Sequence, residues 1–172
     1  PMYLGRVSGP YHISLVTTVI GAAKAALDEY EDIIRKKKTT FPPFVPRAEH
    51  EDFQRALGQA TVLTDAAENL MIRGCEVYME MCQRWAADGT PITVEQNLRL
   101  WAMMQQAGRM ACDAVELLFK NAGTSVTRKG SRMERYFRDA QMYRVHPSSL
   151  FENFWAPVGR AHLGLPIRHF NF

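Results

Sequence analysis

Apolar residues recur at steps of three and four along most of this chain, and this spacing constrains its fold more than any other feature. Such steps place the residues on one face of an α-helix. After a turn predicted at Gly9-Pro10, the first stripe comprises Ile13, Val16, Ile20, Ala23, Leu27, Tyr30 and Ile34. It ends before 39–46, where closely spaced prolines cannot continue a helix.

Two further stripes predict two more long helices. The second helix is expected to begin among Glu49, Glu51 and Asp52, because the helix dipole favours acids in a first turn, and to end at Asp88-Gly89. Its apolar face comprises Phe53, Leu57, Ala60, Leu63, Ala67, Leu70, Gly74, Tyr78, Met81 and Trp85. The third helix is expected to begin at a capping box. That box is formed by Thr93 and Gln96, and the stripe comprises Leu98, Trp101, Gly108, Cys112, Val115 and Phe119, before 121–123 ends it.

The remainder of the chain predicts two shorter helices. Ser131 and Glu134 have the spacing of a second capping box, which would begin a helix that runs to about His146. After Pro147, an amphipathic segment covers 151–164. Since long helices joined by short loops pack antiparallel, residues 1–172 are predicted to form a single domain, an all-α, up-and-down four-helix bundle with an extra C-terminal helix.

Three glycines lie inside predicted helices, where each costs about 1 kcal/mol relative to alanine and therefore predicts a close helix–helix contact. They are Gly58, Gly74 and Gly108. Near the far ends of the long helices, Tyr78, Trp85 and Trp101 are expected to be exposed and to contribute to an oligomer interface.

Composition excludes several classes of function. The net charge of +3 is small, and the one dense basic run, 35–38, complements the dipole at a helix end, so no nucleic-acid partner is expected. The three cysteines lack the close pairs that a metal site needs and predict reduced core residues in the cytoplasm. No apolar run approaches the roughly 20 residues of a membrane span. The chain shows no secretion leader and begins with Pro1, as a processed protein or a piece of a longer one would.

The stretch 118–146 contains the candidates for chemistry. Gly123, Thr124 and Ser125 offer backbone N–H groups and two hydroxyls beside helix ends, which could bind a phosphate. By pattern alone, a simple helix-ending turn is the favoured interpretation. His146 ends a helix, and on its own such a histidine is more often a cap than a catalyst.

The order of these parts resembles the C-terminal domain of the acyl-CoA dehydrogenase superfamily. The first helix ends in a tyrosine followed by basic residues, Tyr30, Arg35 and Lys37, and the second begins with Gln-Arg-Ala-Leu-Gly at 54–58. The third leads to an Ala-Gly loop, and the fourth contains Arg-Asp at 138–139. Nearly the whole chain takes part in the resemblance.

One departure from that pattern points to a subgroup. Acyl-CoA dehydrogenases follow Arg-Asp with a segment like Ile-Tyr-Glu-Gly-Thr and keep a Gly-Gly in the loop. Here Arg-Asp is followed by Ala-Gln-Met-Tyr-Arg-Val-His-Pro, and the loop has a single glycine. The histidine seven residues after the aspartate resembles the flavin-dependent two-component monooxygenases of this fold, which hydroxylate phenols or oxygenate the nitrogen of amino sugars.

The resemblance implies a catalytic role for His146, near the reactive edge of the flavin. There it would hydrogen-bond the flavin hydroperoxide or take a proton from a substrate hydroxyl, both within reach of an imidazole near neutral pH. The substrate would be an aromatic compound or an amine.

The resemblance also implies a cofactor site. Gly123, Thr124 and Ser125 would contact the phosphate side of a flavin, in a neighbouring subunit, with Lys37 or else Arg35 as its cation. The cofactor would be reduced FMN from a separate flavin reductase, with FAD as the alternative. The assembly would be a homotetramer.

Members of the superfamily have two further domains before this bundle, so the chain is expected to be the C-terminal part of a three-domain flavoenzyme and inactive alone. Two alternatives stay open. An acyl-CoA dehydrogenase would need a glutamate base, for which Glu116 and Glu134 are available, and a tightly bound FAD. A non-enzymatic oligomerisation module would bind no flavin.

Overall fold

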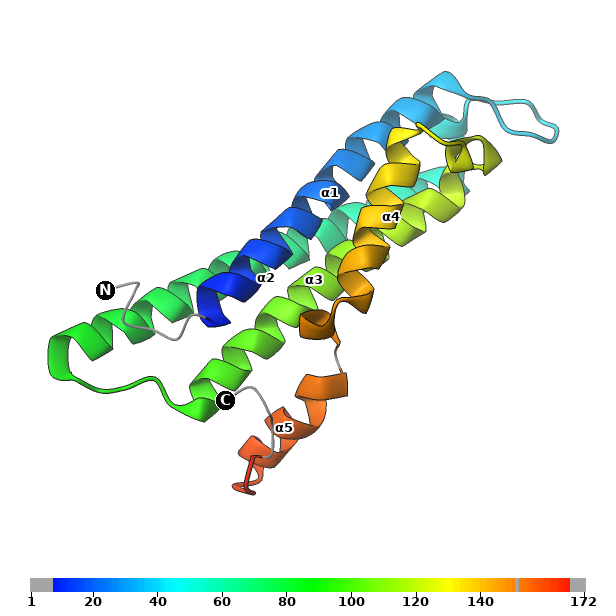
Figure 1. Cartoon of the computed structure of the whole chain (residues 1–172). Coiled ribbons are helices and arrows are strands. Elements are labelled where there is room, and N and C mark those ends of the chain that lie inside the picture. The colour runs from blue at the N-terminus through cyan, green and yellow to red at the C-terminus, as the bar shows by residue number, and fades with distance from the viewer. Residues whose placement is uncertain (1–7, 151, 168–172) are drawn as a thin grey trace.

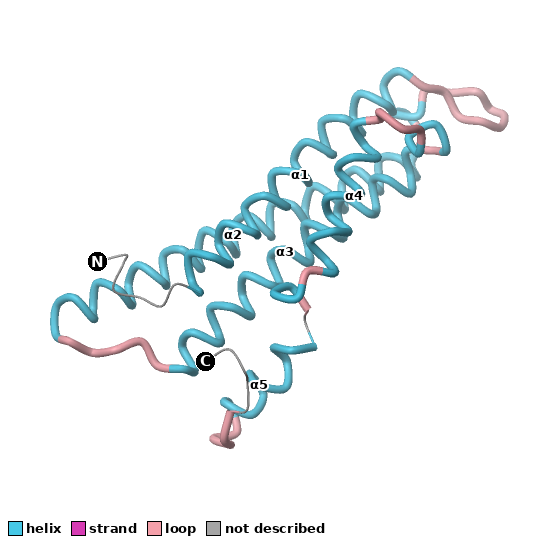
Figure 2. The backbone as a smooth tube through the Cα atoms, in the orientation of Figure 1, coloured by secondary structure: helices cyan, strands magenta, loops and turns pink. Residues whose placement is uncertain are grey.

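The computed structural model describes residues 8–150 and 152–167, which form a bundle of helices (Figures 1 and 2). The α-helices are α1 (Ser8–Lys36), α2 (Glu51–Asp88), α3 (Val94–Ala122), α4 (Arg132–Val145) and α5 (Glu152–His162). Three short 3-10 turns lie between them, η2 (Arg47–Glu49), η3 (Thr124–Thr127) and η4 (Pro147–Ser149). The described ranges contain no β-strand, and their only β-pairing is an isolated bridge between Lys38 and Pro46.

Helices α1 to α4 alternate in direction, and α3 lies at the centre of the arrangement (Figure 1). α3 contacts α1, α2, α4 and α5, which explains why it has buried side chains on most of its faces. α5 lies beyond the end of α4, and its main packing partner among the α-helices is α3. The predicted up-and-down four-helix bundle with an extra C-terminal helix is therefore confirmed.

Local turn chemistry sets the helix ends near residue 90 as predicted. Gly89 adopts a left-handed conformation with φ of 73° and ends α2, because glycine has no side chain to clash there. The hydroxyl of Thr93 accepts a hydrogen bond from the Gln96 N–H at 3.2 Å. The Gln96 side chain accepts one from the Thr93 N–H at 3.1 Å, which completes the capping box.

One predicted helix start and one predicted capping box are wrong, although α4 does begin after Ser131 as its N-cap. α1 already begins at Ser8, so Gly9-Pro10 lies in the first helical turn, where a proline costs no hydrogen bond. At α4, the Ser131 side chain makes no capping hydrogen bond. The Ser131 N–H is instead bonded to the Arg128 carbonyl at 3.1 Å, and the Glu134 carboxylate pairs with Arg138 one turn later. Phe151, the predicted start of the last amphipathic segment, lies outside the described residues.

The glycines confirm two of the three predicted close contacts. A Cβ at Gly74 would lie 1.8 Å from the Met104 methyl, and one at Gly108 would lie 2.2 Å from the Tyr143 hydroxyl. Gly58 is different, because it is exposed and no atom would lie within 4 Å of its Cβ. The prediction for Gly58 is wrong, since α2 turns that face to solvent.

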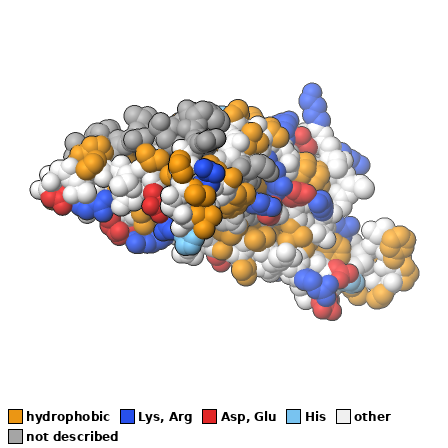
Figure 3. Space-filling view, turned by 90° about the horizontal axis from the view of Figure 1, so that it is seen from below, with side chains coloured by type: hydrophobic (Ala, Val, Ile, Leu, Met, Phe, Trp, Pro, Cys, Tyr) orange, Lys and Arg blue, Asp and Glu red, His pale blue; other side chains and the backbone are white. Residues whose placement is uncertain are grey.

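The aromatic residues proposed for an oligomer interface are mostly inside the domain. Tyr78 and Trp101 are only 3% and 4% exposed, and Trp85 is half-buried. Trp101 is covered by α5, whose Phe154 ring lies 5.7 Å away from it. The exposed aromatic surface lies elsewhere, on the loop after α1, where hydrophobic side chains form the right-hand tip in Figure 3.

The cysteines are free thiols, as predicted, with Cys82 and Cys112 buried and Cys75 half-buried. Burial raises the pKa of the Cys112 thiol to about 11, so it stays protonated and packs as an apolar residue. Of the described helices, none is both long enough and apolar enough to cross a membrane.

Candidate functional site

A groove with a volume of about 710 Å³ lies between α1 and α4, within the range of small-molecule sites. Its α1 wall is made of small or apolar residues and one threonine: Leu15, Thr18, Val19, Gly21, Ala22 and Ala25. The opposite wall is more polar and comprises Arg135, Tyr136, Asp139, Met142, Tyr143 and His146. The groove therefore combines an apolar side with titratable groups.

His146 lies where α4 ends, at one end of this groove. Its backbone N–H is bonded to the Tyr143 carbonyl at 3.1 Å, and its ring is half-buried. Nδ1 of the ring accepts a hydrogen bond from the Ser148 N–H at 3.2 Å, so the ring caps the following turn. Because a neutral imidazole has one acceptor and one donor nitrogen, this contact leaves the proton on Nε2. His146 is thus both a cap and a groove residue.

A second histidine lies behind the groove. His12 of α1 is 3% exposed, and its ring centroid is 4.4 Å from that of Trp101. Burial, and secondarily the charge of nearby His146, lower the pKa of His12 from 6.5 to about 4. His12 is therefore uncharged at neutral pH. It occupies the buried face of α1 one turn before Val16, a position that the apolar stripe could have indicated.

The predicted cofactor residues meet at the other end of α4. Lys37, just after α1, donates a hydrogen bond from Nζ to the Ser125 hydroxyl, although the two residues are 88 positions apart. Gly123 has a φ of 91°, which favours glycine, and begins the turn that contains Thr124. Thr124 and Ser125 are both exposed. The ammonium group of Lys37 and the hydroxyl of Ser125 thus meet beside a turn that begins with a permissive glycine.

Arg47 holds the two segments of this cluster together, and no sequence pattern pointed to it. Its Nε donates to the Lys38 carbonyl and its Nη1 to the Ala122 carbonyl, each at 3.0 Å. A Cβ at Gly123 would lie only 3.2 Å from Nη1, so glycine is also needed for space. The guanidinium of Arg47 therefore fixes the distance between the end of α1 and the loop after α3.

The structure distinguishes the two candidate cations. Arg35 is bonded through Nε and Nη2 to Glu31 at 2.9 and 2.6 Å, one turn back in its own helix. Lys37, not Arg35, faces the loop after α3. The helix ends between them, so the backbone turns Lys37 toward Ser125.

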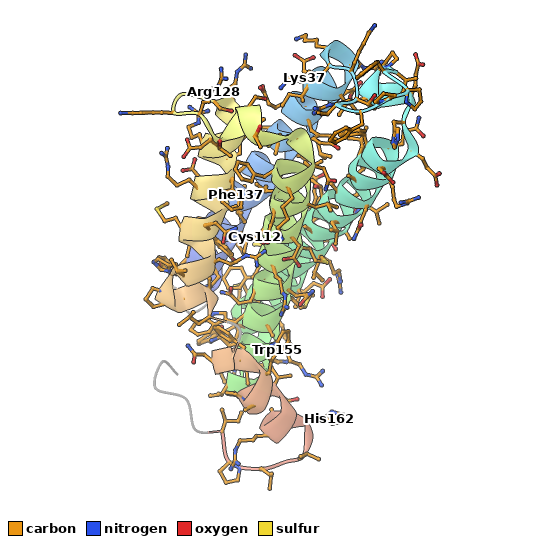
Figure 4. The ribbon with its side chains drawn as sticks, turned by 90° about the vertical axis from the view of Figure 1, so that its right-hand side faces the viewer. Lys37, Cys112, Arg128, Phe137, Trp155 and His162 are labelled. Carbon is orange, nitrogen blue, oxygen red and sulfur yellow. The ribbon has the colours of Figure 1, made fainter. Side chains whose placement is uncertain are left out.

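His146 and the Lys37–Ser125 pair are not brought together within one chain. They lie at opposite ends of α4, and its 14 residues correspond to about 21 Å at 1.5 Å per residue. Figure 4 shows Lys37 at the same end of the bundle as Arg128, with Trp155 and His162 at the opposite end.

The two glutamates that could serve as the base of an acyl-CoA dehydrogenase are both in ion pairs. Glu116 pairs with Lys120 at 2.6 Å and with Arg144 at 3.2 Å, and the hydrogen bond from Lys120 is the main cause of its lowered pKa. Glu134 pairs with Arg138 at 3.4 Å. Neither carboxylate is among the residues that line the groove, and a lowered pKa makes Glu116 a weaker base.

Asp139 is a groove residue that the sequence did not single out as a site candidate. In the sequence, Arg138 and Asp139 stand out only as the Arg-Asp of the family resemblance. Arg138 pairs within α4, whereas Asp139 is exposed and lines the groove one turn before Tyr143. The difference could not be seen from the dipeptide, since it depends on which side of α4 faces α1.

Comparisons with known proteins find a matching family and several relatives of the same fold. A family model described as "Acyl-CoA dehydrogenase, C-terminal domain" matches residues 13–149. Among curated proteins, HsaA of Rhodococcus jostii (strain RHA1), the oxygenase subunit of a flavin-dependent monooxygenase, is 29% identical over 79 residues. That alignment covers 46% of this chain and 21% of HsaA.

Solved structures share the fold over nearly the whole chain. 3-HSA hydroxylase from Rhodococcus sp. RHA1 has a TM-score of 0.77 at 20% identity, over 94% of this chain and 41% of that one. XiaF from Streptomyces sp., in complex with FADH2 and glycerol, has a TM-score of 0.81 at 19% identity, over 93% and 39%. The HsaA monooxygenase from M. tuberculosis has a TM-score of 0.74 at 19% identity, over 94% and 40%. The chain thus spans about two fifths of each of these structures.

Proposed function

This chain belongs to the family of acyl-CoA dehydrogenase C-terminal domains, and from that premise we propose that it is the helical domain of a reduced-flavin-dependent monooxygenase. The parent enzyme would transfer one oxygen atom to an aromatic compound or an amine. The named relatives that the chain resembles are flavin-dependent monooxygenases, which supports this choice within the family. Since the chain spans only part of them, the parent would contain the two further domains expected from the sequence.

The observation that carries the proposal is the histidine at the end of the groove. A dehydrogenase would need a glutamate base, yet both candidate glutamates are held in ion pairs outside the groove. His146 lines the groove and has its ring orientation set by Ser148. An oriented imidazole beside an apolar wall suits proton donation or hydrogen bonding to a reacting oxygen.

The hydrogen bond to Ser148 favours one of two roles for His146. With Nδ1 accepting from the Ser148 N–H, the ring presents a protonated Nε2 and can donate a hydrogen bond. Accepting a proton from a substrate hydroxyl at Nε2 would first require the ring to move its proton to Nδ1, against the Ser148 N–H. We therefore assign His146 as a hydrogen-bond donor to the reacting centre. The bound flavin would supply the oxygen-activating chemistry.

The cluster around Ser125 fits the phosphate of a flavin. An ammonium group and hydroxyls are suitable donors to phosphate oxygens, and Lys37 and Ser125 already lie in contact. Thr124 and the N–H groups that follow Gly123 would add further donors. Reduced FMN from a separate reductase is the first candidate for this site. FAD is the second, and the FADH2 in the XiaF structure supports it.

A separation of about 21 Å along α4 supports an oligomeric site. FMN is too short for its ring to lie at His146 while its phosphate contacts Lys37 of the same chain. The loop of one subunit would therefore serve the flavin of a neighbour, in a homotetramer located in the cytoplasm. Co-expressing Lys37→Met and His146→Ala parents tests this, since mixed oligomers would regain part of the activity that each variant lacks.

The proposed function is tested in the full-length parent with its flavin reductase. His146→Ala should lower the ratio of hydroxylated product to hydrogen peroxide, and His162→Ala, an exposed histidine at the end of α5, should not. Equal coupling ratios for the parent and for His146→Ala would remove His146 from the mechanism.

Flavin binding separates the proposal from its alternatives. A monooxygenase domain in its parent should prefer reduced over oxidised flavin. A non-enzymatic module should bind neither, and a dehydrogenase should purify with tightly bound FAD. Equilibrium binding of FMN and FAD in both redox states decides among these outcomes.

A further inference from the structure

A buried amide on α3 connects to the turn that orients His146. Gln105 is only 1% exposed and lies in the middle of α3. Its Nε2 donates a hydrogen bond to the carbonyl of Ser148, the residue whose N–H caps the His146 ring. The short turn η4 is thus bonded to α3 through the Ser148 carbonyl and to the His146 ring through the Ser148 N–H.

The other contacts of Gln105 leave its amide only one favourable orientation. Its Oε1 accepts a hydrogen bond from the Tyr143 hydroxyl at 3.3 Å. Its Nε2 also faces Nδ1 of His12 at 3.2 Å. A flipped amide would point its oxygen at the Ser148 carbonyl, and two acceptors repel each other. The amide nitrogen therefore serves both Ser148 and His12.

His12 contributes by being an acceptor. Its pKa is lowered to about 4 chiefly by burial, so the ring is neutral at neutral pH and has one acceptor nitrogen. Because Nδ1 faces the amide nitrogen of Gln105, we assign the acceptor to Nδ1 and the proton to Nε2. The ring is fixed between Tyr11, Trp101 and Phe154, whose centroids lie 5.4, 4.4 and 6.4 Å away. A rigid acceptor on α1 thus selects the orientation of an amide on α3.

We propose that Gln105 is a positioning residue for His146, which fixes the ring through the Pro147–Ser149 turn, with His12 as the acceptor that orients the Gln105 amide. The inference rests on the proposed function for its catalytic consequence, whereas the structural part stands on the contacts alone. A buried amide is costly unless all its hydrogen bonds are made, and here they link α1, α3, α4 and η4.

The structural part is tested by NMR on the ¹⁵N-labelled chain without flavin. Gln105→Met keeps the length of the side chain and removes both the donor and the acceptor. The Ser148 amide should then exchange its hydrogen about tenfold faster, the effect of one lost hydrogen bond. The two ring nitrogens of His146 should also become less different in chemical shift as tautomers mix. Gln106→Met, the same change at the neighbouring half-buried position, is the matched control.

Unchanged Ser148 exchange in Gln105→Met would overturn the proposal. So would an equal acceleration of all amides in α2 and α3, which indicates general destabilisation. If Gln105→Met does not fold, His12→Phe and His12→Asn replace it. Phe removes the acceptor and should accelerate Ser148 exchange, whereas Asn keeps an oxygen near the place of Nδ1 and should restore protection. Equal exchange in these two variants would also refute the inference.

The catalytic consequence is tested in the parent enzyme. Gln105→Met should lower kcat and the coupling ratio with little effect on KM, because it disturbs the orientation of His146 rather than the groove. If NMR shows the predicted changes but coupling is unaffected in both Gln105→Met and His146→Ala, the proposed function fails and the positioning stands. If His146→Ala uncouples the enzyme but Gln105→Met changes neither exchange nor coupling, the positioning fails and the function stands.

Discussion

The buried His12 makes stability depend on pH in a predictable direction. Its pKa is about 4 in the folded chain and 6.5 when unfolded, so between these values the unfolded chain binds more protons. The stabilisation from an uncharged His12 is fully present above pH 6.5. It is lost as the pH falls toward 4, because the ring must then be either protonated in a buried site or released by unfolding.

The magnitude follows from the size of this pKa interval. One pH unit corresponds to about 1.4 kcal/mol, so the full interval corresponds to roughly 3 kcal/mol. Going from about pH 7.5 to about pH 5 should cost about 2 kcal/mol of unfolding free energy through His12 alone. Relative to a typical total of roughly 5 to 15 kcal/mol, this loss is large enough to measure.

Urea unfolding followed by far-ultraviolet circular dichroism at several pH values measures the effect. His12→Asn cannot titrate in this range, so the difference in unfolding free energy between the wild type and this variant should shrink by about 2 kcal/mol toward pH 5. His162→Asn, at an exposed site on α5, should run parallel to the wild type at every pH. A constant difference between the wild type and His12→Asn would refute a strongly lowered pKa at His12.

Three further changes test packing and the cofactor cluster. Gly58→Ala should raise the unfolding free energy by up to about 1 kcal/mol, since the site is exposed and open, and thermal unfolding checks it. Gly108→Ala should lower it by about 1 to 3 kcal/mol, because the new methyl would overlap the ring of Tyr143; a neutral or stabilising result would contradict the close approach. In the parent, Lys37→Met should weaken reduced-flavin binding about tenfold, and Arg35→Met, which breaks only an ion pair within α1, should not.

The fold was predictable because each long helix carries its own signals. The apolar stripes identify the buried faces, as in α1, where Val16, Ile20, Ala23, Tyr30 and Ile34 are all buried. The helix ends near residue 90 depend on turn chemistry within a few residues. Such local signals do not require knowledge of the partner helix, so they can be read from the chain itself.

The candidate site was only partly predictable. The order of parts shared with a known family connected Lys37 with the loop at 123–125, and the structure brings Lys37 and Ser125 into contact. Arg47, which holds this cluster, makes its contacts with backbone carbonyls that any sequence would provide. A contact of this kind therefore cannot be predicted from a residue pattern.

The network around Gln105 could not be predicted for a related reason. Gln105 and His12 are 93 positions apart, and each lies in a stripe where a polar residue looks like an interruption. Their pairing depends on the rotation of α1 against α3, which periodicity leaves undetermined. The exposed state expected for Trp101 fails in the same way, since only the packing of α5 shows that the ring is covered.

The two histidines also explain why a histidine suits position 146 better than the glutamate of the alternative enzyme class. A charge on His146 lowers the pKa of His12, so the field at 146 acts directly on the buried ring. A carboxylate in place of His146 would act with the opposite sign and favour protonation of His12. A protonated His12 has no lone pair for the Gln105 amide, whose contact with Ser148 would then lose its fixed orientation. A neutral or cationic groove residue at position 146 therefore suits the buried network better than a carboxylate would.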